Sequence, residues 1–411
     1  MRILYLHPNA WIGEYAMLVK LGELGHKVFV LEEKRGLEHG GKRQVAGYLK
    51  SATDRITTLW YDPRRGWERL VTWIPDRIFR RAFDGRNLVH RMWVIAEAVR
   101  RFSPDVIVCS DGFTYAISAA FLKQLGLLRP RLIVSYIGGD ILDIPAAEYG
   151  RRRTPLTDWL IRTSLPAADV LRPVSPMLRE VLLRDGAQSS RVHVCPSHLA
   201  ADEHVLARIR SERSGVRKRT RSRYGITEDA PLVVTLSGNQ KGKGMQVLAE
   251  AWPAVVERCP GARWLLCGHD DPWLRSAVWP LLERHGLRGT VIATGRLAAP
   301  ATYEHLAAAD VNVNPSLGEG LNMVTVEAAA VGTPSVTSGA AGIAHWVASR
   351  GAGAIVPVGD PAALASAVVQ ALEDHGLRER WAAAGVAMAR EFSLEGIAGD
   401  LLALAQAEQR R

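Results

Sequence analysis

The chain has 411 residues, of which 47% are hydrophobic, and this content is sufficient for two domains with separate cores. No stretch of about 18 uncharged apolar residues occurs, which excludes a membrane-spanning helix, and the opening MRILYLHPNA is typical of a strand rather than a signal peptide. The net charge of +10 permits nucleic acid, an anionic membrane surface or an anionic ligand as partner. We therefore expect a cytoplasmic protein.

The first forty residues predict a βαβ unit. MRILYLHPNA indicates a buried strand, residues 15–24 a helix that ends at Gly25, and KVFVLEE a second strand. Gly13 falls in the loop between the first strand and the helix, where a glycine lets the backbone approach a phosphate. A plain turn glycine explains this residue equally well.

We expect residues 36–101 to be irregular at first and then helical. Residues 55–101 hold more basic than acidic side chains, interleaved with aromatic ones. Residues 73–83 place apolar side chains on one helical face with arginines near it. Such a helix either lies on an anionic membrane surface or packs its apolar face on its own sheet. A nucleic-acid interface is the weaker interpretation, because no recognisable module surrounds the stretch. A peripheral position on the inner face of a membrane stays open.

Two buried strands with polar ends come next. PDVIVCSD ends at Asp111, and RLIVSYIGGD ends at Asp140. Catalytic groups of open parallel sheets gather at the carboxyl ends of strands, so Asp111 and Asp140 are the candidate catalytic residues of the first half. Each of them suits a helix cap or a turn equally well.

The connection to the second half follows. Residues 208–223 are dense in arginine with few apolar side chains, which predicts a solvated helix leading out of the interdomain linker.

The second half opens with a buried strand, PLVVTLSG, that leads into a glycine-rich basic loop and then a helix from Gln246. This arrangement is used to bind phosphates. The loop includes Gly238, Asn239, Lys241 and Lys243, and it is not a Walker loop, since G-x-x-x-x-G-K-[ST] is absent. A lysine in such a loop is merely solvated in the alternative interpretation.

Residues 310–334 predict a strand, a loop and a helix in succession. Asn322 is a good N-cap, so Glu319 lies just before the helix and Glu327 about one and a half turns inside it, roughly 7 Å along the axis. The helix N-terminus offers N–H groups and a positive dipole end to a diphosphate, while Glu319 accepts hydrogen bonds from a sugar and Glu327 from a ribose. In the alternative interpretation, Glu319 only interacts with the positive end of the helix dipole, and Glu327 is exposed on the surface of the helix.

The pattern P-S-x-x-E-G-x-x-x-x-x-x-E-A-x-A-x-G-T-P in this segment resembles the donor-site signature of the family 4 retaining glycosyltransferases. Lys243, Gly244 and Leu248 match the family's G-R-x-x-x-K-G-x-x-x-L, but Asn239 stands nearest the place of the arginine, for which Lys241 is the candidate substitute. The loop from Thr294 to Leu297 resembles the family's G-x-V loop, which contacts the base. ADVLRPVSPMLREVLLRDG and RVHVCPS resemble the last strands of the family's N-terminal domain. The family's usual histidine near Ser110 is missing.

The resemblance implies an α/β fold of the GT-B type, with two Rossmann-like, doubly wound parallel-sheet domains that face a cleft. We expect an acceptor domain over residues 1–200, a nucleotide-sugar donor domain over residues 201–391, and a C-terminal helix over residues 392–411 that packs back toward the first domain.

The resemblance also implies transfer of a hexosyl group from a UDP- or GDP-type sugar to an acceptor hydroxyl, with retention of anomeric configuration. The acceptor is a glycan, a glycolipid or a small natural product, and no cofactor or metal is expected. Expected catalytic residues are Glu319, Lys243, Asp140 and Asp111. Expected donor-binding residues are Gly13, Gly238, Asn239, Lys241, Lys243, Gly295, Arg296, Glu319, Gly320, Leu321, Asn322, Met323 and Glu327.

Two other classes of function remain open from the sequence. A nucleotide-sugar epimerase or a phosphorylase would keep a donor site without a saccharide acceptor, and a non-catalytic protein would bind a nucleotide without turnover. An NAD-dependent oxidoreductase is disfavoured, because neither first βα turn carries G-x-G-x-x-G.

Overall fold

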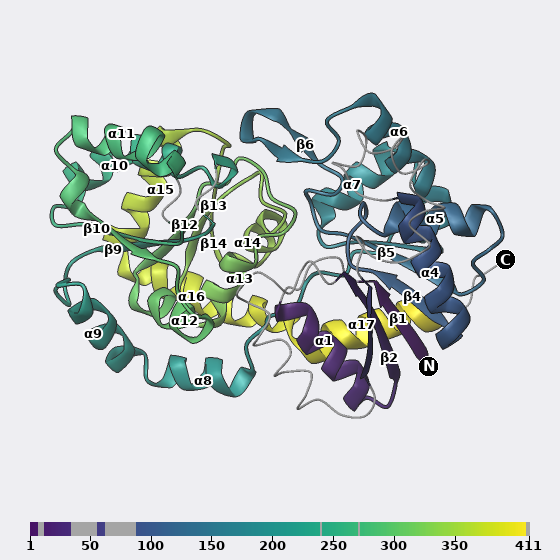
Figure 1. Ribbon diagram of the computed structural model, residues 1–411. Coiled ribbons are helices and arrows are strands. Elements are labelled where there is room, and N and C mark those ends of the chain that lie inside the picture. Colours follow the sequence, from purple (N-terminus) through teal and green to yellow (C-terminus); the bar gives the residue numbers. More distant parts are fainter. Residues whose placement is uncertain (7–11, 34–55, 62–87, 239–240, 270–271, 408–411) are drawn as a thin grey trace. The chain divides into compact units, whose positions relative to one another are not determined.

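The computed structural model describes residues 1–6, 12–33, 56–61, 88–238, 241–269 and 272–407 (Figure 1). The chain divides into two compact units. Unit 1 comprises Met1–Asp143, Gly150–Ala200 and Leu394–Arg411, and unit 2 comprises Ile144–Tyr149 and Ala201–Ser393.

Unit 1 contains a six-stranded sheet in which every pair of neighbouring strands is parallel. The strands are β1 (Arg2–Leu6), β2 (Lys27–Glu33), β3 (Ile56–Tyr61), β4 (Val106–Cys109), β5 (Arg131–Tyr136) and β8 (Val170–Pro173). Their order is β3-β2-β1-β4-β5-β8, so the strand order reverses between β1 and β4. This is the doubly wound order of a Rossmann fold.

Helices cover the sheet of unit 1 (Figure 1). They are α1 (Ile12–Glu23), α4 (Leu88–Phe102), α5 (Ala116–Gln124), α6 (Pro155–Ser164), α7 (Pro176–Arg184) and α17 (Leu394–Gln406). Helix α17 packs beside α1, where Ile397 and Leu401 join the buried core with Leu18 and Leu21. The prediction that the C-terminal helix returns to the first domain is therefore confirmed. A short pair, β6 (Asp143–Ile144) and β7 (Tyr149–Gly150), extends the chain into unit 2.

Unit 2 contains a second six-stranded parallel sheet, in the order β11-β10-β9-β12-β13-β14. The strands are β9 (Leu232–Leu236), β10 (Arg263–Cys267), β11 (Val291–Gly295), β12 (Val311–Asn314), β13 (Ser335–Ser338) and β14 (Gly353–Val356). The helices are α8 (Glu203–Ser211), α9 (Arg213–Arg223), α10 (Met245–Arg258), α11 (Trp279–Arg284), α12 (Ala299–Ala308), α13 (Met323–Ala330), α14 (Ala344–Arg350), α15 (Pro361–Glu373) and α16 (His375–Ala389). The prediction of two Rossmann-like parallel-sheet domains is confirmed.

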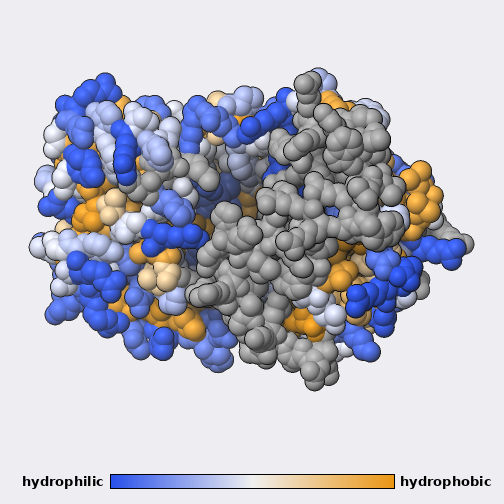
Figure 2. Space-filling view, viewed as in Figure 1, coloured by the Kyte–Doolittle hydropathy of each residue, from blue (hydrophilic) through white to orange (hydrophobic). Residues whose placement is uncertain are grey.

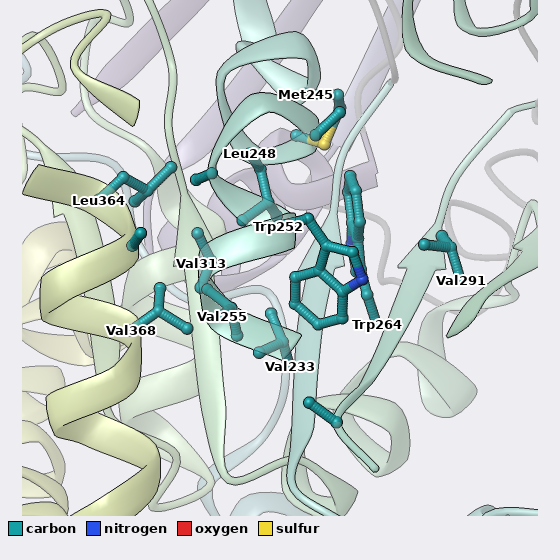
Figure 3. Close-up of a cluster of buried hydrophobic side chains, with 14 of the residues drawn as sticks. Val233, Met245, Leu248, Trp252, Val255, Trp264, Val291, Val313, Leu364 and Val368 are labelled. Atoms are coloured by element: carbon teal, nitrogen blue, oxygen red, sulfur yellow. The ribbon is translucent and has the colours of Figure 1, made fainter. Parts of the chain in front are cut away.

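The core of unit 2 is built around two tryptophans (Figure 3). Trp252 of α10 and Trp264 of β10 are fully buried, with ring centroids 5.7 Å apart. Both indole N–H groups find an acceptor, because Trp252 donates to Thr290 Oγ1 and Trp264 to Thr235 Oγ1, each at 2.8 Å. Helices α10 and α15 pack together over this core. The rigid layer that results supports the loops at the carboxyl ends of the strands.

Strand β3 differs from the sequence-based expectation, which placed irregular and then helical structure in this region. ITTLWY is a parallel edge strand paired with β2. Its β-branched and aromatic residues favour extended backbone on a sheet. The expected amphipathic helix over residues 73–83 lies outside the described residues. Within the described parts, no helix is both long and apolar enough to span a membrane.

Two boundaries also differ. Helix α1 begins at Ile12, so Gly13 belongs to its first turn rather than to a loop. RVHVCPS forms an isolated bridge between Val192 and Leu171 rather than a strand, although His193 N and Cys195 N also donate to Leu171 O and Pro173 O. Pro173 lacks the N–H group that a full ladder with this segment would need.

The prediction of a solvated helix over residues 208–223 is wrong for its inner face. This segment spans the end of α8 and all of α9, and the outward side chains over it are mostly hydrophilic (Figure 2). Arg221, however, is fully buried and donates to both Ala308 O and Asp310. Three further arginines of the segment, Arg210, Arg213 and Arg217, donate to backbone carbonyls of unit 2.

Candidate functional site

Glu319 is the centre of a hydrogen-bonded cluster in unit 2. Lys243 Nζ donates to Glu319 Oε1 at 2.6 Å. Ser316 Oγ and Asn322 Nδ2 donate to Oε2 at 3.0 and 2.6 Å. The side chains of Lys243 and Glu319 are 27% and 18% exposed, so their ion pair is partly desolvated yet reaches the surface. Charges in such a place interact more strongly than they do in water.

The backbone holds the Glu319 loop in one position. Glu319 N donates to Ala340 O at 3.1 Å, and Gly342 N donates to Glu319 O at 3.0 Å. Ile343 N then donates to Leu321 O at 2.7 Å. These bonds join the loop before α13 to the loop after β13. The carboxylate is therefore preorganised by its neighbours.

The N-terminus of α13 begins directly beside this cluster. Asn322, at a φ of 83°, caps the helix, since its Oδ1 accepts from Thr325 N at 2.9 Å. The N–H groups of Met323 and Val324 donate to no acceptor within the described residues. Free N–H groups and the positive end of the helix dipole favour an anion here. Gly320 and Leu321, which connect Glu319 to the Asn322 cap, are buried.

The glycine-rich loop lies against the same segment. Lys241–Lys243 forms a 3₁₀ turn, and Leu317 N donates to Gly242 O at 2.9 Å. Gly244 follows with a φ of 70°, and a Cβ on it would meet Pro315 O at 2.0 Å. Only glycine permits this close approach, which places Lys243 within reach of Glu319.

Replacing Gly244 by alanine should therefore destabilise unit 2 by about 3 kcal/mol or more, because strain at positive φ adds to a backbone clash. Gly261→Ala is the matched control, since Gly261 has a φ of 83° and nothing within 4 Å of its Cβ position. The control should lose only about 1 kcal/mol. Urea denaturation of both variants measures the difference, and equal losses would contradict the packing described here.

Glu327 lies on α13 beside Tyr303 of α12. The residue as a whole is half-buried, and within the described part of the chain its carboxyl forms no hydrogen bond or ion pair. Removal of water by the surrounding protein raises the pKa of Glu327 to about 7. A carboxylate without partners in such surroundings is a candidate acceptor for ligand hydroxyls.

The raised pKa makes stability depend on pH. The folded state holds the Glu327 proton to about pH 7, whereas an unfolded glutamate releases it near pH 4.5. The protonated Glu327 carboxyl therefore contributes to the free energy of unfolding at low pH, and this contribution is lost as the pH rises through 7. From pH 5 to pH 8, the free energy of unfolding should fall by roughly 2 kcal/mol more in the wild type than in Glu327→Gln. Chemical denaturation at both pH values tests this, and parallel profiles would contradict it.

The remaining predicted donor residues of unit 2 follow the carboxyl ends of strands of the same sheet. Gly238 follows β9, Gly295 ends β11, and Arg296 is exposed just beyond it. Lys241 forms an ion pair with Glu148, N to O 3.1 Å, and both side chains are exposed. Asn239 lies outside the described residues. Their roles in binding stay predictions.

The candidates of unit 1 are engaged with backbone. Asp140 accepts hydrogen bonds from Gly112 N at 2.7 Å and Gly138 N at 2.8 Å. Asp111 accepts from the N–H groups of Phe113 and Thr114. Burial and the neighbouring Asp111 carboxylate raise the pKa of Asp140 to about 6. The two carboxylates thus lie near each other and form turns, and their catalytic role stays a prediction.

Some site residues were not singled out from the sequence. Ser316 donates to both Asn314 Oδ1 and Glu319 Oε2. In unit 1, Glu14 accepts from Tyr5 at 2.6 Å beside the buried Arg172, close to Gly13. The P-S pair before Glu319 was a usable signal for Ser316, whereas nothing in the local pattern pairs Glu14 with Tyr5.

Known protein families match both halves of the chain. "Glycosyl transferase 4-like domain" matches residues 15–198, and "Glycosyl transferases group 1" matches residues 230–374. The phosphatidyl-myo-inositol mannosyltransferase of Mycobacterium leprae is 36% identical over 162 residues. That match covers 39% of this chain and 42% of the relative, so this chain spans less than half the length of the curated relatives it first matches.

Solved structures resemble the whole chain. A glycosyltransferase from Rickettsia africae has a TM-score of 0.75 at 14% identity and covers 98% of this chain and 97% of its own. Anabaena Alr3699/HepE in complex with UDP and glucose has a TM-score of 0.72 at 18% identity and covers 98% of each chain.

The two Rossmann-like parallel-sheet units and their likeness to these solved structures define a GT-B fold. The two matched descriptions, one in each half, make the assignment more specific. The chain belongs to the family 4-like glycosyltransferases.

Proposed function

We propose that this chain is a retaining glycosyltransferase that moves a hexosyl group from a nucleotide diphosphate sugar to an acceptor hydroxyl. The observation that carries the proposal is the Lys243–Glu319 pair at the N-terminus of α13. Here a cation, free N–H groups and a fixed carboxylate meet within one loop and one helix turn.

The diphosphate fits the positive part of this site. Lys243 and the N–H groups of Met323 and Val324 would contact phosphate oxygens, whose charge grows as the sugar departs. Glu319 would then accept hydrogen bonds from the hexose, and Glu327 from the ribose. Gly295 and Arg296 would contact the base, and Gly238 would lie against another part of the donor.

Proton transfer needs no further carboxylate in this proposal. The departing phosphate takes the proton of the acceptor hydroxyl as the new bond forms on the same face of the sugar. Asp111 and Asp140 then keep the turns after β4 and β5 in place, as their backbone hydrogen bonds suggest. The protein needs no resident cofactor or metal ion for these steps.

Donor and acceptor classes draw support from the relatives. The Anabaena protein was crystallised with UDP and glucose, which supports a nucleotide sugar of the UDP or GDP type. The M. leprae relative is named for a phosphatidyl-myo-inositol acceptor, which supports a lipid-linked or saccharide acceptor. A lipid acceptor would bring the chain to the inner face of a membrane, and co-flotation with anionic vesicles at low salt would detect this.

Release of nucleotide diphosphate tests the proposed reaction. The chain is incubated with UDP- and GDP-hexoses, with and without candidate acceptors, and free nucleotide is measured. A transferase releases nucleotide in proportion to acceptor. An epimerase would convert the sugar without releasing nucleotide, a phosphorylase would require inorganic phosphate, and a non-catalytic protein would bind without turnover.

A further inference from the structure

Helix α13 has only eight residues, so its two ends are close together. Its N-terminus carries the Asn322 cap and the free N–H groups of the candidate site. The helix packs against α12, α16 and β13 with most of its residues buried, and a helix this short moves as one body, so a shift of its C-terminus also shifts its N-terminus. How the C-terminus is held thus bears on the geometry of the site.

Most of the last carbonyl groups of α13 are satisfied locally. Gly332, with a φ of 80°, allows a C-terminal cap in which Thr333 N donates to Ala328 O at 2.9 Å and Gly332 N donates to Ala329 O at 3.0 Å. This is the Schellman pattern of hydrogen bonds. The cap leaves the carbonyls of Ala330 and Gly332 to other donors.

Two arginines outside α13 fill that role. Arg210 Nη1 donates to Ala330 O at 2.6 Å, and Arg213 Nη1 donates to Gly332 O. Both guanidinium groups thereby lie at the negative end of the helix dipole, where a cation is stabilising. Burial and the neighbouring Arg217 lower the pKa of Arg213 to about 10, so Arg213 still carries its charge at neutral pH.

Arg213 also joins α13 to α12. Its Nε donates to Ala307 O at 3.2 Å, and its Nη2 donates to Thr333 Oγ1 at 3.2 Å. One planar, five-donor group therefore holds the C-terminal ends of two helices together. A lysine at this position has no such fork and cannot reproduce all of these bonds.

Arg217, one turn further along α9, has a different set of partners. It donates to Ala308 O at 3.2 Å and to Asp310 Oδ1 at 2.7 Å. These groups belong to α12 and the start of β12, and α13 is not among its partners. Arg217 is thus a matched control on the same helix.

We propose that Arg210 and Arg213 are positioning residues for the donor site, acting through the C-terminus of α13. The inference rests on the proposed function for its effect on donor affinity, but its effect on α13 itself does not. Without the guanidinium groups, two carbonyls at the negative end of the helix lose their donors. Helix α13 then frays and shifts, and Asn322 and Glu319 move with it.

Hydrogen exchange gives the first readout. Arg210→Ala and Arg213→Lys should raise the exchange rate of the α13 amides by about tenfold relative to the wild type. Arg217→Ala should leave α13 unchanged, even if it lowers Tm as much as the other two. Equal exchange of α13 in all three variants would overturn the proposal, whether or not the chain binds nucleotide.

Donor binding gives the second readout. The apparent KM for the nucleotide sugar, measured in the wild type first, should rise about tenfold in Arg210→Ala and Arg213→Lys, and less than twofold in Arg217→Ala. Arg210→Lys, which keeps one donor for Ala330 O, should recover part of the loss. An increase in KM that follows Tm across all the variants would make the arginines merely structural. A wild type without nucleotide binding would instead refute the proposed function, and the exchange experiment would still decide this inference.

Discussion

Lys243→Ala should lower kcat for glycosyl transfer by about 10² to 10³-fold, because Lys243 is the only side-chain cation that the described residues place against Glu319. The lost interaction is with charge that develops on the departing diphosphate, so kcat should fall more than donor affinity. Steady-state release of nucleotide at saturating acceptor measures the effect.

Lys218→Ala is the control for this prediction. Lys218 carries the same charge and pairs with Glu228 on the surface of unit 2. Its loss should change kcat by less than about fivefold, since exposed charge pairs are weak. Equal effects in the two variants would mean that the general positive charge of unit 2, rather than the placement of Lys243, serves catalysis.

Glu319→Gln should lower kcat/KM by roughly 10²-fold while leaving the fold intact. The amide keeps the shape of the side chain but loses the charge opposite Lys243, and its NH₂ cannot accept the bonds now donated to the carboxylate. Turnover with the donor that the wild type prefers measures the loss, and the melting temperature reports on the fold.

Glu250→Gln provides the comparison for Glu319→Gln. Glu250 is exposed on α10 and accepts only from Gln246 among the hydrogen bonds described for it. That variant should retain the activity of the wild type. Activity of Glu319→Gln within twofold of Glu250→Gln would remove Glu319 from the donor site.

The two Rossmann-like sheets could be predicted because each strand carries its own signal. VIVC is a short, fully apolar run, and RWLLC is apolar after its first residue; both end at turn residues, and such runs favour buried parallel strands. Strand β3 was missed because its threonines and aromatic residues follow a long segment without a periodic pattern. Edge strands give weaker signals than central ones.

The candidate site was predictable from local spacing only in part. The spacing places Glu319 and Glu327 on one loop and helix, and the structure agrees. The contact between Lys243 and Glu319 depends on the close approach of Gly244 to Pro315, which lies about 70 residues away in the sequence. No pattern within the glycine loop indicates that partner.

The arginine-rich segment shows why composition alone misleads. Its charge predicts a solvated helix, but Arg213 and Arg221 donate to carbonyls of residues 307–309, near the end of α12. Burial of an arginine is permitted where helix ends supply unpaired oxygens, and that supply is a property of the fold. Asp111 and Asp140 are parallel cases, since their backbone donors appear only once the turns are formed.

Calorimetric titration of the whole chain with UDP- and GDP-hexoses shows whether the site at α13 binds a nucleotide sugar. We expect saturable binding at one site, with a dissociation constant in the micromolar to low millimolar range, that is lost in Glu319→Ala and kept in Glu250→Gln. Absence of binding to every donor at millimolar concentration, or binding that Glu319→Ala leaves unchanged, would contradict it.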